Sequence, residues 1–142
     1  MMEREQIEAM LPHRPPFLWI DRVEELEPGL RCVATKRIDP ADPLFAGHFP
    51  GNPIVPGVLL IEAVAQTAGV MLASAAPQNA LRTALLASVQ HFKFLRPVTP
   101  GQQIRIETRK LTALGRMACI SGEVFVDGEK VAQGELSVVS AG

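Results

Sequence analysis

The sequence has little cysteine, almost no net charge and no internal repeats. Its two cysteines, Cys32 and Cys119, show no C-x-x-C spacing, so we expect two free thiols in a reducing compartment. The formal net charge of −1 gives no reason to expect a nucleic acid as partner. These scarcities argue against a disulfide-bonded protein and against a nucleic-acid-binding one.

The sequence also lacks an uninterrupted hydrophobic run of membrane-spanning length. The apolar run from Val58 to Leu72 contains Glu62 and Gln66, and it is shorter than the roughly 20 residues of a membrane helix. Residues 1–8 are charged and lack the apolar core of a secretory signal peptide. With 142 residues, of which 47% are hydrophobic, the chain is long enough for one substantial core. We therefore expect one domain over residues 1–142, located in the cytoplasm and without a membrane partner.

Proline and glycine divide the first third of the chain into recognisable elements. Residues 3–10 have helix-forming composition, and three prolines between residues 11 and 16 end that helix. A strand is predicted over residues 17–26, and a Pro-Gly turn separates it from a second strand over residues 30–38. This part of the chain therefore predicts a short helix followed by a hairpin.

The middle of the chain combines a long loop with one apolar helix. Residues 39–57 hold too much proline and glycine for a regular element, and a loop of this length is more often functional than accidental. A helix is predicted over residues 58–74, apolar on nearly every face and therefore buried all round. From residue 85 onwards, alternation with period two predicts strands, and Asp127-Gly128 is a hairpin signal. We expect an α+β protein in which an antiparallel sheet wraps around the helix.

The loop ends in a segment with one histidine, Gly-His-Phe-Pro-Gly-Asn-Pro over residues 47–53. A lone histidine in such a loop most often hydrogen-bonds a turn. Here the glycines at 47 and 51 allow close backbone approach and the proline at 50 restricts the loop. Imidazole also exchanges protons near neutral pH. His48 is therefore a candidate acid or base.

The helix that follows carries one carboxylate among apolar residues. An ionised Glu62 in this setting is costly unless it is paired, and the apolar residues around it argue against a solvent-facing position. We therefore expect Glu62 to be buried and functional. Gln66 lies four residues later, on the same helix face, where it can orient the Glu62 carboxyl group or a water molecule. A solvent-facing Gln66 is nearly as common an outcome.

The first residues of this helix matter through their backbone. The first N–H groups of a helix have no partner inside it and carry the positive end of its dipole. At Gly57 and Val58 they can polarise a carbonyl group and stabilise the negative charge that develops on its oxygen. An ordinary helix start is the alternative interpretation.

These segments together resemble a known family. The sequence Gly-His-Phe-Pro-Gly-Asn-Pro, then Pro-Gly-Val, then a helix with Glu-Ala-x-Ala-Gln is similar to the β-hydroxyacyl-acyl-carrier-protein dehydratases of type II fatty-acid synthesis. The match is closer to the FabZ-type branch than to the FabA-type isomerase branch, because the helix acid is Glu62 and not Asp. Residues 11–14 (Leu-Pro-His-Arg) and 96–98 (Arg-Pro-Val) fit flanking blocks of the family. The resemblance implies the hotdog fold.

The resemblance also implies a reaction and a role for each residue. In a (3R)-3-hydroxyacyl thioester, His48 would abstract the C2 proton, Glu62 would protonate the leaving hydroxyl, and the Gly57 N–H would hold the thioester oxygen. The product is the trans-2-enoyl thioester, and no metal or redox cofactor is needed. Further substrate contacts are expected from Phe49, Val58, Gln66 and Phe94.

The implied partner is an acyl carrier protein with a phosphopantetheine-linked acyl chain. Such carriers are acidic, so we expect a basic patch, with Lys93 and Arg96 as candidates. In the family, the histidine and the glutamate face each other from different subunits, which implies a homodimer or a trimer of dimers. His13, in the Leu-Pro-His-Arg block, is expected to support structure. Leu95 departs from the family's usual basic residue, which leaves open the carrier and the choice between bulk and specialised acyl synthesis.

Two other functions suit the same sequence. In a hotdog acyl thioesterase the carboxylate would activate water to hydrolyse the thioester, and His48 would have no evident role. A non-catalytic subunit that binds acyl chains or completes an oligomer is the other alternative, but it gives no reason for both His48 and Glu62 to be present.

Overall fold

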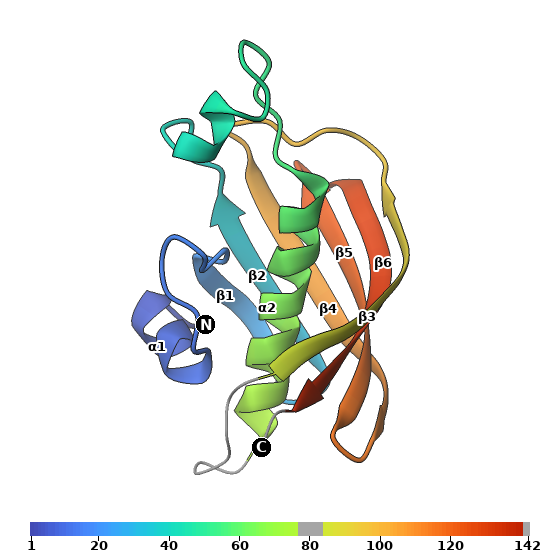
Figure 1. Ribbon diagram of the computed structural model, residues 1–142. Coiled ribbons are helices and arrows are strands. Elements are labelled where there is room, and N and C mark those ends of the chain that lie inside the picture. The colour runs from blue at the N-terminus through green and yellow to red at the C-terminus, as the bar shows by residue number, and fades with distance from the viewer. Residues whose placement is uncertain (77–83, 141–142) are drawn as a thin grey trace.

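The structure, a computed structural model, describes residues 1–76 and 84–140 and places one long helix against a six-stranded antiparallel sheet (Figure 1). The strand order across the sheet is β1-β2-β4-β5-β6-β3, and the helix α2 contacts every strand. In chain order the elements are α1 (Arg4–Met10), β1 (Arg22–Glu27), β2 (Arg31–Arg37), a 3-10 helix (Pro43–Ala46), α2 (Gly57–Ala75), β3 (Ala84–Phe94), β4 (Gln103–Leu114), β5 (Met117–Val126) and β6 (Glu129–Ser140). The predicted α+β arrangement is confirmed.

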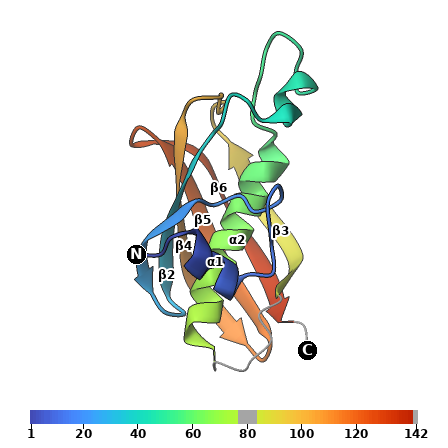
Figure 2. The ribbon, with the colours of Figure 1, turned by 90° about the vertical axis from the view of Figure 1, so that its left-hand side faces the viewer.

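Helix α2 supplies the centre of the core. It has 19 residues and a mean hydropathy of 1.7, so by length and composition alone it would suit a membrane span, but 56% of its apolar window is buried inside the protein. The buried residues are Leu60, Ala63, Val64, Gln66, Thr67, Ala68, Gly69, Val70, Met71 and Ala73. The prediction of burial on all sides is wrong at the first turn, where Val58 is 70% exposed. That turn lies at the end of the helix next to the long loop, which projects beyond it (Figures 1 and 2).

The sheet meets α2 through strict alternation of side chains. In β5 every second residue from Ala118 to Val126 is buried, and in β4 Ile104 and Ile106 are fully buried, as the period-two pattern predicted. Gly122 belongs to the buried set of β5. A Cβ atom at Gly122 would lie 2.4 Å from Cγ1 of Val64, so the helix and the sheet could not come this close with a larger residue.

The first strand begins later than the sequence predicted. The prediction started it at residue 17, but β1 begins at Arg22. The side chain of Gln66, from α2, binds two backbone groups of the segment before β1. The Trp19 N–H donates to Gln66 Oε1 (2.7 Å), and Gln66 Nε2 donates to the Phe17 carbonyl (2.9 Å). Because these groups bind the helix, they are not used in a strand ladder.

Other local predictions agree with the structure. Helix α1 has a capping box made by Glu3 and Gln6, and it packs against α2 (Figure 2). Asp127 and Gly128 are the only two residues between β5 and β6, and their φ angles of 50° and 79° are those of a tight hairpin turn. Cys32 is a free thiol, and burial raises its pKa to about 12.

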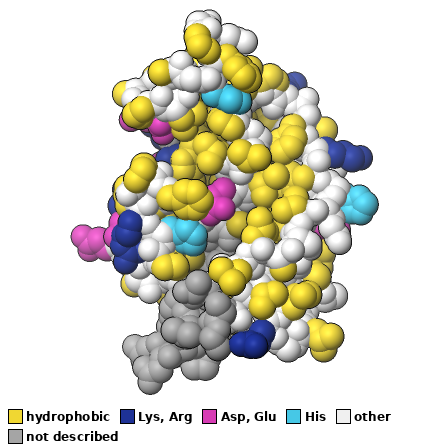
Figure 3. All heavy atoms as spheres, in the orientation of Figure 1, with side chains coloured by type: hydrophobic (Ala, Val, Ile, Leu, Met, Phe, Trp, Pro, Cys, Tyr) yellow, Lys and Arg dark blue, Asp and Glu magenta, His cyan; other side chains and the backbone are white. Residues whose placement is uncertain are grey.

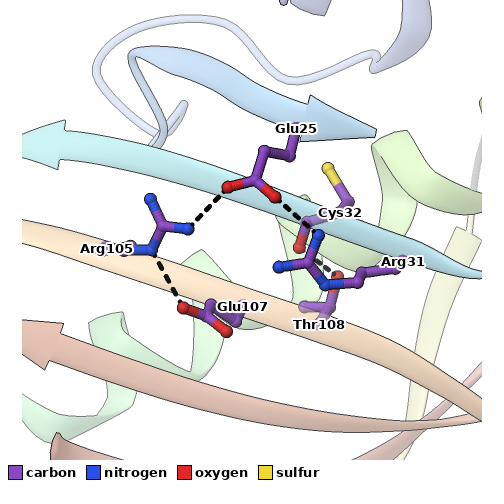
Figure 4. A network of polar contacts seen from close by, with 6 residues as sticks. All are labelled: Glu25, Arg31, Cys32, Arg105, Glu107 and Thr108. Atoms are coloured by element: carbon purple, nitrogen blue, oxygen red, sulfur yellow. Dashed lines mark hydrogen bonds and ion pairs between the residues drawn. The ribbon is translucent and has the colours of Figure 1, made fainter. Parts of the chain in front are cut away.

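The outer face of the sheet carries a network of ion pairs (Figure 4). Glu25 accepts hydrogen bonds from Arg31 and Arg105, each at 2.8 Å, and Arg105 also donates to Glu107 at 2.9 Å. Glu25 and Glu107 are the cross-strand neighbours of Val33, which is fully buried although it faces away from α2. The network therefore covers an apolar residue on the otherwise solvated face.

We expect Glu25→Gln to weaken the pH dependence of stability at acidic pH. The guanidinium groups of Arg31 and Arg105 hold the pKa of Glu25 below its ordinary value of 4.5. Glu25 therefore stabilises the fold above pH 4.5, and this contribution is lost as the pH falls through the lower folded-state pKa. Urea unfolding across this range at low salt measures the effect. Glu135→Gln is the control, and an equal change in both variants would contradict the prediction.

Candidate active site

The loop before α2 fixes the orientation and the tautomer of His48. The imidazole stacks on Phe49, with ring centroids 4.0 Å apart, and Nδ1 lies 2.8 Å from the carbonyl oxygen of Ile54. A carbonyl oxygen only accepts, so Nδ1 is the protonated nitrogen in this contact. In a neutral His48, Nε2 is then the unprotonated nitrogen, free to take a proton.

His48 lies in the same pocket as the start of α2. This His48 pocket has a volume of about 570 Å³. Its lining includes His48, Gly57, Val58, Phe94 and Arg96. A Cβ atom at Gly57 would lie 2.9 Å from the Phe94 ring, so only glycine admits the ring at this distance. The unpaired N–H groups of the helix start therefore occur in an apolar pocket with a proton acceptor.

Glu62 lies in a second, smaller pocket. This Glu62 pocket has a volume of about 110 Å³, and its lining includes Glu62, His13, Phe17 and Gly69. The Glu62 side chain is 21% exposed, so the prediction of a buried carboxylate is correct only in part. The adjoining walls are apolar, which suits a hydrocarbon chain.

Gln66 holds the Glu62 carboxyl group in place. Its side chain is 1% exposed, and Nε2 donates to Glu62 Oε2 at 2.9 Å. The same amide group binds the backbone of Phe17 and Trp19, as described above. Gln66 is therefore buried and not solvent-facing, and it contacts Glu62 as the i, i+4 spacing predicted.

Sequence reasoning missed the contact between His13 and Glu62. His13 was expected only to support structure, but its Nε2 lies 3.7 Å from Glu62 Oε2. The two residues are 49 positions apart, so spacing carried no signal of the contact. The only sequence signal was that His13 belongs to a block that matches the family.

The predicted site residues fall into two groups within one chain. His48, Gly57, Val58 and Phe94 line one pocket, and Glu62 lines the other. Gly57 and Glu62 are five residues apart on α2, which places them about 140° apart around the helix axis. They therefore face different directions. Phe49 is 49% exposed beside His48.

The surface around these pockets is strongly apolar. Figure 3 shows hydrophobic side chains gathered over α2 and towards β3. Strand β3 is an edge of the sheet and exposes Leu85, Leu86 and Val89 by 56%, 45% and 41%. Of the predicted basic residues, Lys93 is exposed, and Arg96 forms an ion pair with Glu129. Within the described residues, no group of three or more His, Cys, Asp or Glu side chains could hold a metal ion.

The arrangement can perform proton transfer next to a polarised carbonyl group. His48 offers an unprotonated Nε2, and the start of α2 offers N–H donors for an oxyanion. Glu62 offers a carboxyl group that Gln66 holds in place in a pocket with apolar walls. A base, an oxyanion site and an acid are the parts that elimination of a β-hydroxyl group requires.

Comparison with known proteins identifies the family. A family model described as a FabA-like domain matches residues 11–135. A 3-hydroxyacyl-[acyl-carrier-protein] dehydratase FabZ of Geotalea uraniireducens is 40% identical over 141 residues, which cover 99% of this chain and 97% of that protein. A protein of the same name from Thermomicrobium roseum is 43% identical over 136 residues, which cover 96% of this chain and 91% of that protein. The chain therefore belongs to the FabA-like family, and its relatives place it with the FabZ-type dehydratases.

Solved structures confirm the fold. The dehydratase heterocomplex ApeI:P from Xenorhabdus doucetiae superposes with a TM-score of 0.80 and 17% identity, over 96% of this chain and 91% of that one. At this identity the likeness concerns the fold alone, which is the hotdog fold. The dehydratase names of the curated relatives favour a hydro-lyase over the thioesterase and the non-catalytic subunit.

We expect Gln66→Leu to destabilise the protein by about 1–3 kcal/mol, because it leaves the buried Trp19 N–H without an acceptor. Activity should also fall, since Glu62 loses the donor that holds it. Urea unfolding and turnover measure the two effects. The exposed Gln103 gives the matched control, Gln103→Leu, which should leave stability within about 0.5 kcal/mol. Equal stability losses in the two variants would contradict the role of Gln66.

Proposed function

We propose that residues 1–142 act as one cytoplasmic domain that dehydrates (3R)-3-hydroxyacyl groups on an acyl carrier protein to trans-2-enoyl groups. The relatives named FabZ support this substrate, and fatty-acid biosynthesis as the pathway. The observation that carries the assignment is the unprotonated Nε2 of His48 in one pocket with the free N–H groups at the start of α2.

The proposed chemistry is a β-elimination. Nε2 of His48 takes the C2 proton, and the electron pair of that bond forms the C2–C3 double bond. The bond between C3 and its hydroxyl oxygen breaks, and Glu62 supplies the proton that completes a water molecule. The Gly57 N–H donates to the thioester oxygen, on which negative charge develops as the C2 proton leaves.

We propose that each site combines His48 of one subunit with Glu62 of a second copy. The separate pockets of His48 and Glu62 within one chain support this assignment. Strand β3 supplies an interface, because its unpaired edge and its exposed leucines at 85 and 86 are suited to pairing with another chain. The assembly is a homodimer or a trimer of dimers.

Substrate and carrier contacts complete the proposal. Phe49, Val58 and Phe94 surround the reacting end of the acyl group, and Gln66 acts through Glu62. Lys93 and Arg96 meet the acidic carrier, since Arg96 lines the His48 pocket, where the phosphopantetheine arm would enter.

Mixing two inactive variants tests the composite site. His48→Ala and Glu62→Gln should each lower kcat by about 10²–10⁴-fold. When equal amounts are unfolded and refolded together, half of the dimers are mixed and each has one intact site. The mixture should therefore regain about a quarter of the wild-type activity. Mass spectrometry of the intact acyl-carrier adduct, with loss of one water, measures turnover.

The refolded single variants and refolded wild type are the controls for this experiment. No recovery in the mixture would show that His48 and Glu62 act within one chain. Release of the free carrier thiol by the wild-type protein would instead identify a thioesterase and overturn the dehydratase assignment.

We expect Leu86→Asp to separate the subunits, because it places a charge on the proposed β3 interface. Leu114→Asp is the matched control, since Leu114 is 86% exposed at the end of β4 and lines neither the His48 pocket nor the Glu62 pocket. Analytical ultracentrifugation measures the assembly. A Leu86→Asp protein that remains dimeric would rule out this edge as the interface.

A further inference from the structure

We propose that His13 is a positioning residue that, together with Gln66, decides which oxygen of Glu62 carries the acid proton. The inference rests on the proposed role of Glu62 as the acid. It concerns how the protein prepares that acid for each turnover.

Both neighbouring donors approach the same oxygen of Glu62. Gln66 Nε2 lies 2.9 Å from Oε2, and His13 Nε2 lies 3.7 Å from the same atom. The second distance is longer than a hydrogen bond, and contacts of this kind often tighten when a site closes on its substrate. Oε1 of Glu62 has neither of these partners.

The orientation of the Gln66 amide group follows from its backbone partners. The Trp19 N–H can only donate, so the atom that it meets is the amide oxygen of Gln66. The nitrogen of the amide group then faces the Phe17 carbonyl and Glu62, and it donates to both. Gln66 is therefore a fixed donor to Oε2.

The surroundings of His13 make its Nε2 the second donor. Its Nδ1 is buried and has no hydrogen-bond partner within the described residues. A neutral imidazole carries one N–H, and a buried N–H without an acceptor is costly. The hydrogen therefore belongs on Nε2, where Glu62 Oε2 is available as an acceptor.

The segment that carries His13 is held firmly beside α2. The imidazole stacks on the Phe17 ring, with centroids 5.9 Å apart and planes at 11°. Arg14 Nη1 donates to the carbonyl groups of Leu11 (2.9 Å) and His13 (2.7 Å), and Gln66 binds the carbonyl group of Phe17 (2.9 Å). His13 and Glu62 therefore keep their relative positions.

The consequence for the acid follows from carboxyl chemistry. A protonated carboxyl group has one hydroxyl oxygen and one carbonyl oxygen, and only the carbonyl oxygen accepts hydrogen bonds well. The hydrogen bond from Gln66, with His13 Nε2 beside the same atom, makes Oε2 the carbonyl oxygen, so the proton resides on Oε1. Oε1 is then the oxygen that gives its proton to the leaving hydroxyl group.

The test compares His13→Ala with His13→Gln, whose amide nitrogen can replace Nε2 as a donor. His13→Ala removes the donor, and it should lower kcat by about 10- to 10²-fold while KM stays within about 2-fold of the wild-type value. His13→Gln should recover most of kcat. Thermal unfolding of both variants shows whether each is folded under the assay conditions.

A double-mutant cycle separates positioning from a structural role. In a Glu62→Gln background there is no acid proton to place, so His13→Ala should cause no further loss of residual turnover. An equal loss in both backgrounds, or no recovery in His13→Gln, would overturn the inference. Full kcat in His13→Ala would overturn it too, while wild-type protein without any dehydration would overturn the proposed function itself.

Discussion

The buried side chain of Gln66 is the interaction on which the site depends. It joins the core helix to the backbone before β1 and to the carboxyl group of Glu62. A buried amide group must satisfy its donors and its acceptor, so the positions of these three elements are set together. The same requirement keeps residues 17–19 out of the sheet, so that β1 begins only at Arg22, and it holds the Glu62 carboxyl group in one orientation. Core stability and the preparation of the acid therefore share one residue.

The helix α2 separates the proposed catalytic groups as well as organising the core. Its first residues, Gly57 and Val58, line the His48 pocket, while Glu62 lines the other pocket. A single rigid helix cannot turn both groups towards one substrate, because the angular step between residues is fixed. A second copy of the chain is the simplest source of the missing half, and the exposed apolar edge of β3 is consistent with such a partner.

The two faces of the sheet have different physical roles. The inner face is apolar and fits α2 so closely that Gly122 admits no side chain. The outer face carries charged residues, whose ion pairs through Glu25 and Arg105 cover Val33. Part of the apolar surface that remains exposed lies on the edge strand β3 and at the His48 pocket, where the proposed partners would cover it.

The sequence by itself determined the α+β class, the apolar helix, the alternating strands and the Asp127-Gly128 turn, because these follow from local periodicity and backbone preference. It also indicated His48, Glu62 and Gly57, through a motif confined to neighbouring residues. Only the tertiary structure decided that His13 meets Glu62, that Gln66 is buried, and that His48 and Glu62 face different pockets. These depend on how the helix packs against distant segments, and no local pattern records distances between residues that are far apart in the chain.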